Sequence, residues 1–228
     1  LGFHMRISER LPRSTILWHR KSEQAARYMK DAFPSLYERY PNRWKNIHAM
    51  RSTVRLFQHR MRLGGEQYAA NHSFYGYYER FWKKNPKNSD VWEEAHPEWF
   101  AKGYEGKPPQ MCYTEPGFIE QVIEDARHYF DGKGKPYKAV AAGDYFALVP
   151  MDNSSYCKCE RCRTFRTPDA ASKHFTNGLW SDYIFTFVNK VAREIKKTHP
   201  DKYLAALAYS KYAGYPKDVK IEDNVSVQ

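Results

Sequence analysis

The cysteines form the most chemically specific pattern in the sequence. Three of the four, Cys157, Cys159 and Cys162, lie within six residues, and the fourth is Cys112. Three thiolates at C-x-C-x-x-C spacing can face one Zn²⁺, with Cys112 or a histidine as the fourth tetrahedral ligand. The alternatives are free thiols or two disulfides, of which one would have to be a short, awkward bridge inside the cluster. The spacing favours a structural zinc site.

Asp152 and Asn153 form a second candidate site, because they lie just past the apolar segment Tyr145–Pro150. If that segment is a strand of a parallel sheet, both side chains lie at its carboxyl end, where α/β barrels hold their active sites. A carboxylate beside an amide can bind sugar hydroxyls or orient an N-acetyl group. The alternative is an ordinary turn, since Asp-Asn-Ser-Ser is also good turn chemistry.

Four further residues are candidates for the same site. Asn71 and His72 follow a strand-like segment, and His72 can act as an acid or base or donate to a substrate hydroxyl. Tyr209 ends the apolar segment Tyr203–Tyr209. Trp99 lies in a long aromatic loop, where its ring could stack on a sugar or only anchor the loop. A single histidine is also often a structural residue.

The elements that must position these residues alternate between strand and helix. Helix breakers, including Pro34, Gly64-Gly65, Gly132 and Pro200, separate them. The expected strands are Leu36–Tyr40, Gln67–Phe74, Tyr145–Pro150, Tyr203–Tyr209 and Asn224–Val227; the expected helices are Ser22–Ala32, Lys45–Leu63, Pro116–Phe130 and Ala170–Lys197; and residues 75–110 are expected to form a long loop.

This alternation indicates parallel α/β layers. Catalytic residues at strand ends, with about four strand–helix units, predict part of a (β/α)8 TIM-like barrel, which needs ~250 residues when complete. The alternative is a complete open, doubly wound sheet. No G-x-G-x-x-G motif follows any expected strand, so the dinucleotide-binding signal of such sheets is missing.

Composition and charge restrict the class of protein. The chain has 228 residues, of which 16% are aromatic, which excludes a disordered chain. Its apolar runs are too short for a membrane span, and none is expected. The net charge is +11, and residues 1–66 hold 14 Lys and Arg against 5 Asp and Glu. Such a segment can attract nucleic acid, but basic side chains scattered among apolar ones favour solvated helix faces. No nucleic-acid partner is therefore expected.

Several motifs together carry a family resemblance. In order they are NHSF, HPEWFA, QMCYTEPGF, PMDNSSYCKCERC and LAALAYSKY. Over residues 35–228 the chain resembles the bacterial proteins that carry domain of unknown function 4838, partly grouped as glycoside hydrolase family 163. Residues 1–34 are similar to the tail of the small α/β domain that usually precedes this barrel. The resemblance implies a TIM-like catalytic barrel from residue 35 onward.

For function, the resemblance implies endo-β-N-acetylglucosaminidase action on complex N-glycans by an exported bacterial protein, either secreted, periplasmic or surface-attached. It implies substrate contacts for five residues, namely Asn71, His72, Asp152, Asn153 and Tyr209. Among them, the chemistry of Asp152 and His72 makes these two the expected catalytic residues. One departure is Asp152-Asn153 where the family often carries Asp-Gly, which affects the substrate expected. The general acid is expected on a later barrel strand, so the remainder of the barrel is an expected partner. Residues 1–228 alone are expected not to hydrolyse glycans.

The competing hypothesis is a non-catalytic, zinc-stabilised basic module that binds glycan or nucleic acid. The two hypotheses differ in salt dependence. Affinity for nucleic acid falls steeply as salt is added, whereas the binding of a neutral glycan hardly changes.

Overall fold

A single four-stranded sheet lies at the centre of the computed structural model, which describes residues 68–228. The strands follow one another in the order β1-β2-β3-β4. β1 pairs with β2 in antiparallel fashion, whereas β2, β3 and β4 run parallel, with Ala147 opposite Ala205 and Ala205 opposite Ser226. The bounds are β1 (Ala141–Ala142), β2 (Tyr145–Ala147), β3 (Tyr203–Ala206) and β4 (Val225–Val227).

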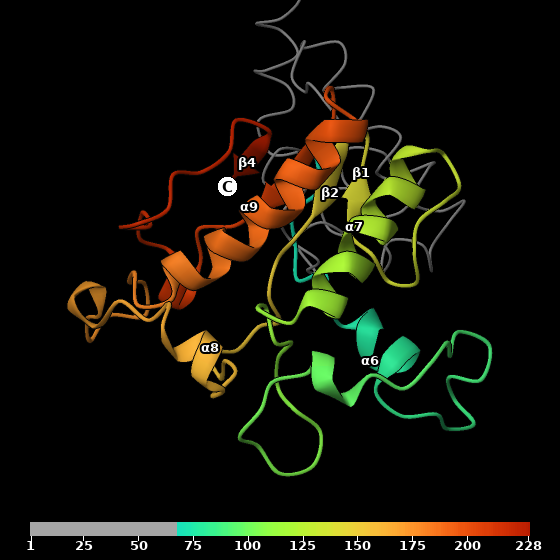
Figure 1. Cartoon of the computed structure of the whole chain (residues 1–228), viewed down its shortest axis with the longest axis horizontal. Helices are drawn as coiled ribbons and strands as arrows, with labels where there is room; N and C mark the ends of the chain where they lie inside the picture. Colours follow the sequence, from blue (N-terminus) through green and yellow to red (C-terminus); the bar gives the residue numbers. More distant parts are fainter. Residues whose placement is uncertain (1–67) are drawn as a thin grey trace, which may run out of the picture. The chain divides into compact units, whose positions relative to one another are not determined.

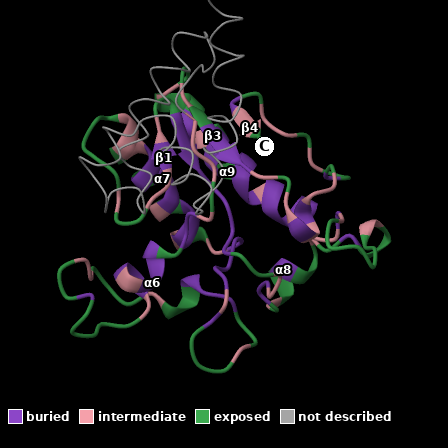
Figure 2. Cartoon of the chain, turned by 180° about the vertical axis from the view of Figure 1, so that it is seen from behind, coloured by how far each residue is buried: buried purple, intermediate pink, exposed green. Residues whose placement is uncertain are grey.

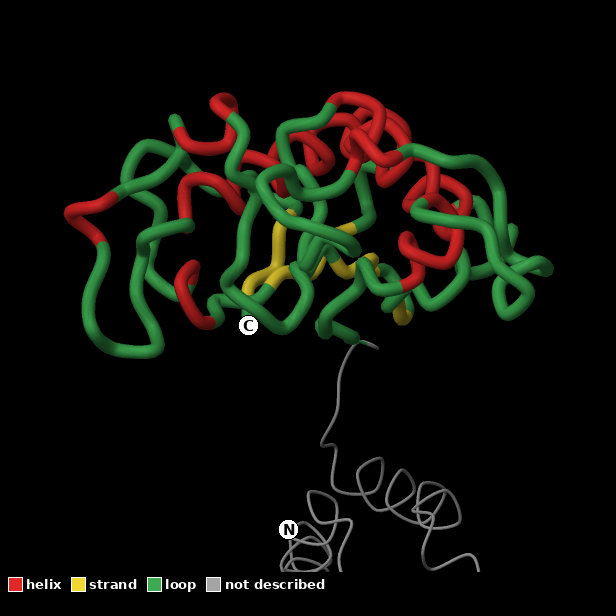
Figure 3. The backbone as a smooth tube through the Cα atoms, turned by 90° about the horizontal axis from the view of Figure 1, so that it is seen from below, coloured by secondary structure: helices red, strands yellow, loops and turns green. Residues whose placement is uncertain are grey.

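Two long helices pack together on one face of this sheet. α7 (Pro116–Phe130) and α9 (Ser181–Thr198) lie side by side, and α9 also contacts β3 and β4 (Figures 1 and 3). α7 begins with Pro116 in its first turn and ends before Gly132, whose φ of +75° suits glycine. Shorter elements are α6 (Gly76–Phe81), α8 (Glu160–Arg163) and 3₁₀ turns at Pro97–Trp99, Pro168–Ala170 and Ser210–Tyr212.

Both faces of the sheet carry apolar side chains, because successive residues of an apolar strand point to opposite faces. Phe146, Leu148 and Leu204 belong to the main core with the buried stripe of α9, while Tyr145, Ala147, Val149 and Ala205 form a smaller cluster on the opposite face. Figure 2 shows these buried segments from the sheet side. A parallel sheet covered on both faces is the usual arrangement in α/β proteins.

The predicted fold class is confirmed as mixed α/β but not as a barrel. Over residues 68–228 the sheet is open, with β1 at one edge and β4 at the other. The antiparallel edge strand β1 was not predicted. It arises because Gly143, at φ +55°, allows a tight turn between Ala142 and Tyr145. Several predictions fall outside the described residues. They are the boundary after residue 34, the strand Leu36–Tyr40, the helices Ser22–Ala32 and Lys45–Leu63, and the whole of the basic segment 1–66.

Residues 68–74 do not form the predicted strand. Only one backbone hydrogen bond joins this segment to the residues that follow β2. It runs from the Ser73 N–H to the Val149 carbonyl at 3.0 Å. The reciprocal bond is absent because the Ser73 hydroxyl accepts from the Val149 N–H, also at 3.0 Å. A side chain thus takes the place of the backbone carbonyl that a ladder would use.

The predicted helix Ala170–Lys197 begins eleven residues late, as α9 starts at Ser181. Asn177 interrupts it, because its side chain accepts from the Leu179 N–H and donates to the His174 carbonyl. Gly178 and Gly214 then approach so closely that a Cβ on Gly214 would lie 2.9 Å from the Gly178 Cα. Side-chain-to-backbone bonds of this kind compete with helix formation.

Residues 75–110 were predicted as a loop, and this prediction is wrong in part. They contain α6 and a 3₁₀ turn, and the side chains of Tyr77, Tyr78, Phe81 and Phe100 are buried. The aromatic content of this segment therefore builds core.

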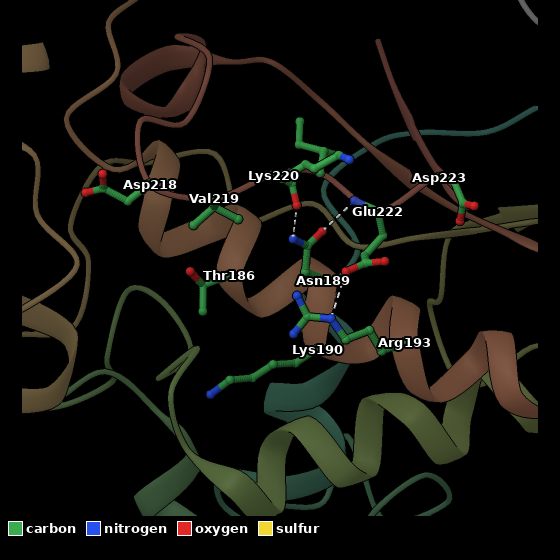
Figure 4. A pocket seen from close by; sticks show the side chains of 10 residues that line it. Thr186, Asn189, Lys190, Arg193, Asp218, Val219, Lys220, Glu222 and Asp223 are labelled. Carbon is green, nitrogen blue, oxygen red and sulfur yellow. Dashed lines mark hydrogen bonds and ion pairs between the residues drawn. The ribbon is translucent and has the colours of Figure 1, made fainter.

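The segment that leads to β4 is held against α9 by Asn189 (Figure 4). The Asn189 amide donates to the Lys220 carbonyl at 2.7 Å and accepts from the Glu222 N–H at 3.0 Å. Arg193 adds an ion pair with Glu222 at 2.7 Å. A buried asparagine therefore fixes the path by which β4 reaches the sheet.

Replacing Asn189 with alanine is expected to lower the free energy of unfolding by roughly 1–3 kcal/mol, because two backbone groups lose their partner. Urea denaturation measures the change. Thr186→Ala is the control, because Thr186 lies on the same helix and lines the same surface pocket as Asn189 (Figure 4). It should change stability by less than about 0.5 kcal/mol. Equal effects of the two substitutions would contradict this role.

Candidate functional site

Three of the predicted site residues meet at the carboxyl end of the parallel strands. Asp152 follows β2, Tyr209 follows β3, and His72 comes from the segment that hydrogen-bonds Val149. The Tyr209 hydroxyl donates to Asp152 Oδ1 at 3.1 Å, and His72 Nε2 lies 3.6 Å from the same oxygen. The imidazole and phenol rings pack edge to face at 5.7 Å. We call these three residues the edge site.

The hydrogen bonds of His72 define what its ring can do. Nδ1 contacts the Pro150 carbonyl, which can only accept, so Nδ1 carries a proton. Nε2 therefore faces Asp152 either as a lone pair or, in the imidazolium form, as a donor. His72 is 18% exposed and Asp152 is 57% exposed, so a ligand can reach the carboxylate while the ring is held in place.

The hydroxyl of Tyr209 is held by its bond to a carboxylate. The bond to Asp152 raises the pKa of Tyr209, so the phenol keeps its proton at neutral pH. Its remaining lone pairs can accept from a ligand, while Asp152 keeps Oδ2 for a donor. The edge site thus offers a carboxylate, an imidazole and a phenol, which suit hydroxyl and amide groups.

The other predicted site residues lie in different surroundings. Asn71 is exposed, and its side chain accepts from the His72 N–H at 2.8 Å. Asn153 uses both ends of its amide to hold the loop, donating to the Pro109 carbonyl and accepting from the Ser155 N–H. Trp99 is 7% exposed and stacks on His96 at 3.9 Å, so the structure places it in the core and does not bring it to the edge site.

Two aromatic residues that sequence analysis missed border the edge site instead. Tyr75 is exposed, its oxygen accepts from the Asp152 N–H at 3.1 Å, and its ring lies 6.4 Å from that of His72. Phe175 is also exposed and packs edge to face on Tyr209 at 5.5 Å. Tyr75 could have been found from its place just after NHSF. Phe175 lies in an irregular segment with no such signal.

The four cysteines form one cluster. Their sulfur atoms all lie within 4.8 Å of one another, with Cys112 Sγ 3.6 Å from Cys162 Sγ and 4.0 Å from Cys159 Sγ. All four are unbonded thiols, and all but Cys159 are buried. The cluster could hold a metal ion, and the predicted fourth ligand is Cys112 rather than a histidine.

Polar groups of the protein contact the sulfur atoms of the cluster, and the four cysteines also affect one another. The Lys102 N–H donates to Cys157 Sγ at 3.2 Å. The Tyr183 oxygen accepts from the Tyr113 N–H and lies 3.0 Å from Cys162 Sγ, a position from which the hydroxyl can donate to a thiolate. Hydrogen bonds from Cys157 and Cys162 hold the pKa of Cys112 far below its usual range, whereas the same interactions raise the pKa of Cys162. Donors to sulfur of this kind surround metal-bound thiolates.

The comparison with known families shows which family the chain belongs to. The family model described as "Domain of unknown function (DUF4838)" matches residues 14–228. The chain belongs to this family. The match confirms the predicted resemblance to DUF4838 proteins and extends N-terminal of residue 35, where the resemblance was expected to begin. No curated protein and no solved structure matches the chain.

The matched region of this DUF4838 chain contains both the edge site and the cysteine cluster. They are connected through the chain itself, since Tyr156 and Cys157 follow Asp152 by a few residues. Within the described residues, no helix is long and apolar enough to cross a membrane.

Proposed function

We propose that this DUF4838 domain is a glycoside hydrolase-like domain whose edge site binds an N-acetylhexosamine unit of a complex N-glycan. The observation that carries the proposal is the convergence of Asp152, His72 and Tyr209 at the carboxyl ends of parallel strands. Binding sites of α/β proteins lie at that end of the sheet. The family resemblance supplies the substrate class.

Each residue of the edge site has a role in this proposal. Asp152 accepts from the N-acetyl N–H or a ring hydroxyl, and during cleavage its charge stabilises the positive charge that develops on the sugar. Tyr209 keeps Asp152 in place, and His72 accepts or donates a proton at Nε2. Tyr75 and Phe175 offer apolar faces to the sugar ring. In the described part of the chain, no second carboxylate hydrogen-bonds to any of the three, and a substrate N-acetyl group can take the role of nucleophile.

The open sheet is proposed to belong to a TIM-like barrel. Sequential parallel strands with α7 and α9 on one face, and a second apolar cluster on the other, are features of such barrels. Ala147 and Ala205 on that second face leave room for side chains from other strands.

We also propose that the cysteine cluster holds structural zinc. A Zn–S distance of about 2.3 Å in a tetrahedron gives a sulfur–sulfur separation of about 3.8 Å. The observed separations of 3.6 and 4.0 Å fit this geometry. Zinc would join the 99–114 segment to α8, and through Tyr183 to α9, without taking part in catalysis.

The sharpest test of glycan binding uses two disaccharides that differ only in their N-acetyl groups. Calorimetric titration should show binding of N,N′-diacetylchitobiose and at least about tenfold weaker binding of cellobiose, because cellobiose lacks the amide that Asp152 accepts from. Raising the salt concentration should hardly change the affinity. Equal affinity for both sugars would contradict the proposal, and tight, salt-sensitive binding of nucleic acid instead would favour the basic-module hypothesis.

A further inference from the structure

A pocket of about 450 Å³ lies next to the edge site. The side chains that matter here are four cations and two aromatic rings, namely Lys158, Arg163, Arg166, Lys211, Tyr104 and Trp180. No Asp or Glu lines it, and Cys157 of the cysteine cluster forms part of its wall. We call it the cationic pocket.

The four cations lack carboxylate partners in the described part of the chain. Lys158 donates to the Gly103 carbonyl, and the structure gives no ion pair to Arg163, Arg166 or Lys211. Arg161, on the same short helix as Arg163, is by contrast paired with Glu115 at 2.6 Å. Four like charges around one hollow raise the local potential, and an anion in it would lower the repulsion among them.

The aromatic rings hold two of these cations in place. The Lys158 ammonium lies 4.2 Å from the ring centre of Tyr104, and the Arg166 guanidinium lies 5.8 Å from that of Trp180. Both distances are within the range of cation–π attraction. Trp180 and Tyr104 are only partly buried, so the pocket combines positive charge with apolar ring surface, a combination suited to a charged sugar.

Two short chain segments link the cationic pocket to the edge site. Ser154, which lines it, follows Asp152 by two residues, and Lys211 follows Tyr209 by two. The hydroxyls of Ser154 and Ser210 lie 3.2 Å apart and join the two loops. Ser210 has a left-handed φ of 52°, uncommon for a residue other than glycine, at the point where the chain turns from one site to the other.

We propose that the cationic pocket binds a carboxylate or sulfate group on a sugar next to the one held at the edge site. This inference rests on the proposed function and narrows its substrate class to anionic glycans. Arginine recognises both oxyanions through paired N–H donors. Lys211 connects the anion to the Tyr209 loop, so the two sites bind neighbouring sugars of one oligosaccharide.

The test compares three probes, N-acetyllactosamine, its sialylated form and its 6-sulfated form, by calorimetric titration of the whole chain. One variant carries Arg163→Gln with Arg166→Gln. The control variant carries Arg161→Gln with Lys173→Gln, which removes the same charge from nearby residues outside the pocket. A third variant, Asp152→Asn, separates the edge site from the pocket.

Wild type should bind at least one anionic probe about tenfold more tightly than the neutral one. Arg163→Gln with Arg166→Gln should abolish this preference, and the control should retain it. Which probe is preferred distinguishes a carboxylate from a sulfate. Absence of preference in wild type, or equal loss in the control, would overturn the proposal. One further outcome separates the two proposals. If Asp152→Asn still prefers the anionic probe, and neither wild type nor any variant binds the neutral probe, anion binding by the cationic pocket is supported and the proposed function of the edge site fails.

Discussion

Replacing Cys162 with serine is expected to remove the bound zinc and lower the melting temperature by at least about 10 °C. Structural zinc contributes on the order of 10 kcal/mol of binding free energy, comparable with the whole stability of a domain. A loss of about 5 kcal/mol lowers Tm by roughly 10–20 °C in a protein of this size. Cys162 is the appropriate position because it is fully buried and contacts both Cys112 and Tyr183.

Metal analysis and thermal denaturation check this expectation together. Wild type should contain about one zinc per chain, and a strong chelator should reproduce the instability of Cys162→Ser. Thr164→Ala, an exposed change two residues away, should leave zinc content and Tm unchanged. Metal-free wild type that contains two disulfides, or whose Tm does not respond to the chelator, would contradict the zinc proposal.

Replacing Asp152 with asparagine is expected to reduce kcat/KM for a complex N-glycan about 100-fold in a full-length enzyme that contains this chain. The substitution keeps the shape of the side chain but removes the charge that faces His72 and the developing positive charge on the sugar. His72→Ala should have an effect of similar size. Folding should change little, since the Asp152 carboxylate is more than half exposed.

Asp144→Asn is the matched control for this experiment. Asp144 precedes β2 at the opposite end of the strand, is 55% exposed, and pairs with Lys202 at 2.8 Å. It has nearly the same exposure as Asp152 but lies away from the edge site, so its kinetics should match wild type. Unchanged turnover in Asp152→Asn would remove Asp152 from the site.

The sequence was most informative where a pattern involves local spacing. The cysteine spacing predicted a cluster, and the structure confirms one, because three ligands within six residues leave few alternatives. α7 and the strands β2, β3 and β4 were also predicted, since each combines an apolar run with a helix breaker or turn. The strands are shorter than predicted because an apolar run does not mark where strand pairing ends. The β2–β3 register stops at Ala147, yet Leu148 still donates to the Ala205 carbonyl, and both Leu148 and Val149 are buried.

Long-range side-chain contacts could not be predicted from the sequence. Trp99 was expected to meet a ligand, yet it is buried against Phe81 of α6, with the two ring centres 4.9 Å apart, and no local pattern predicts this contact. Asn153 and Asn177 carry amide side chains of the kind that bind ligands, but both amides hydrogen-bond to nearby backbone groups instead. Phe175 contacts Tyr209 only because the loop after Ala170 folds back.

The central claim is that Asp152, His72 and Tyr209 hold an N-acetylated sugar. Saturation-transfer NMR with N,N′-diacetylchitobiose tests it most directly, because it detects contact between the protein and the N-acetyl methyl group. Transfer to that methyl is expected in wild type and Asp144→Asn, and loss of transfer is expected in Asp152→Asn. Absence of transfer in wild type, or equal transfer in wild type and Asp152→Asn, would contradict the claim.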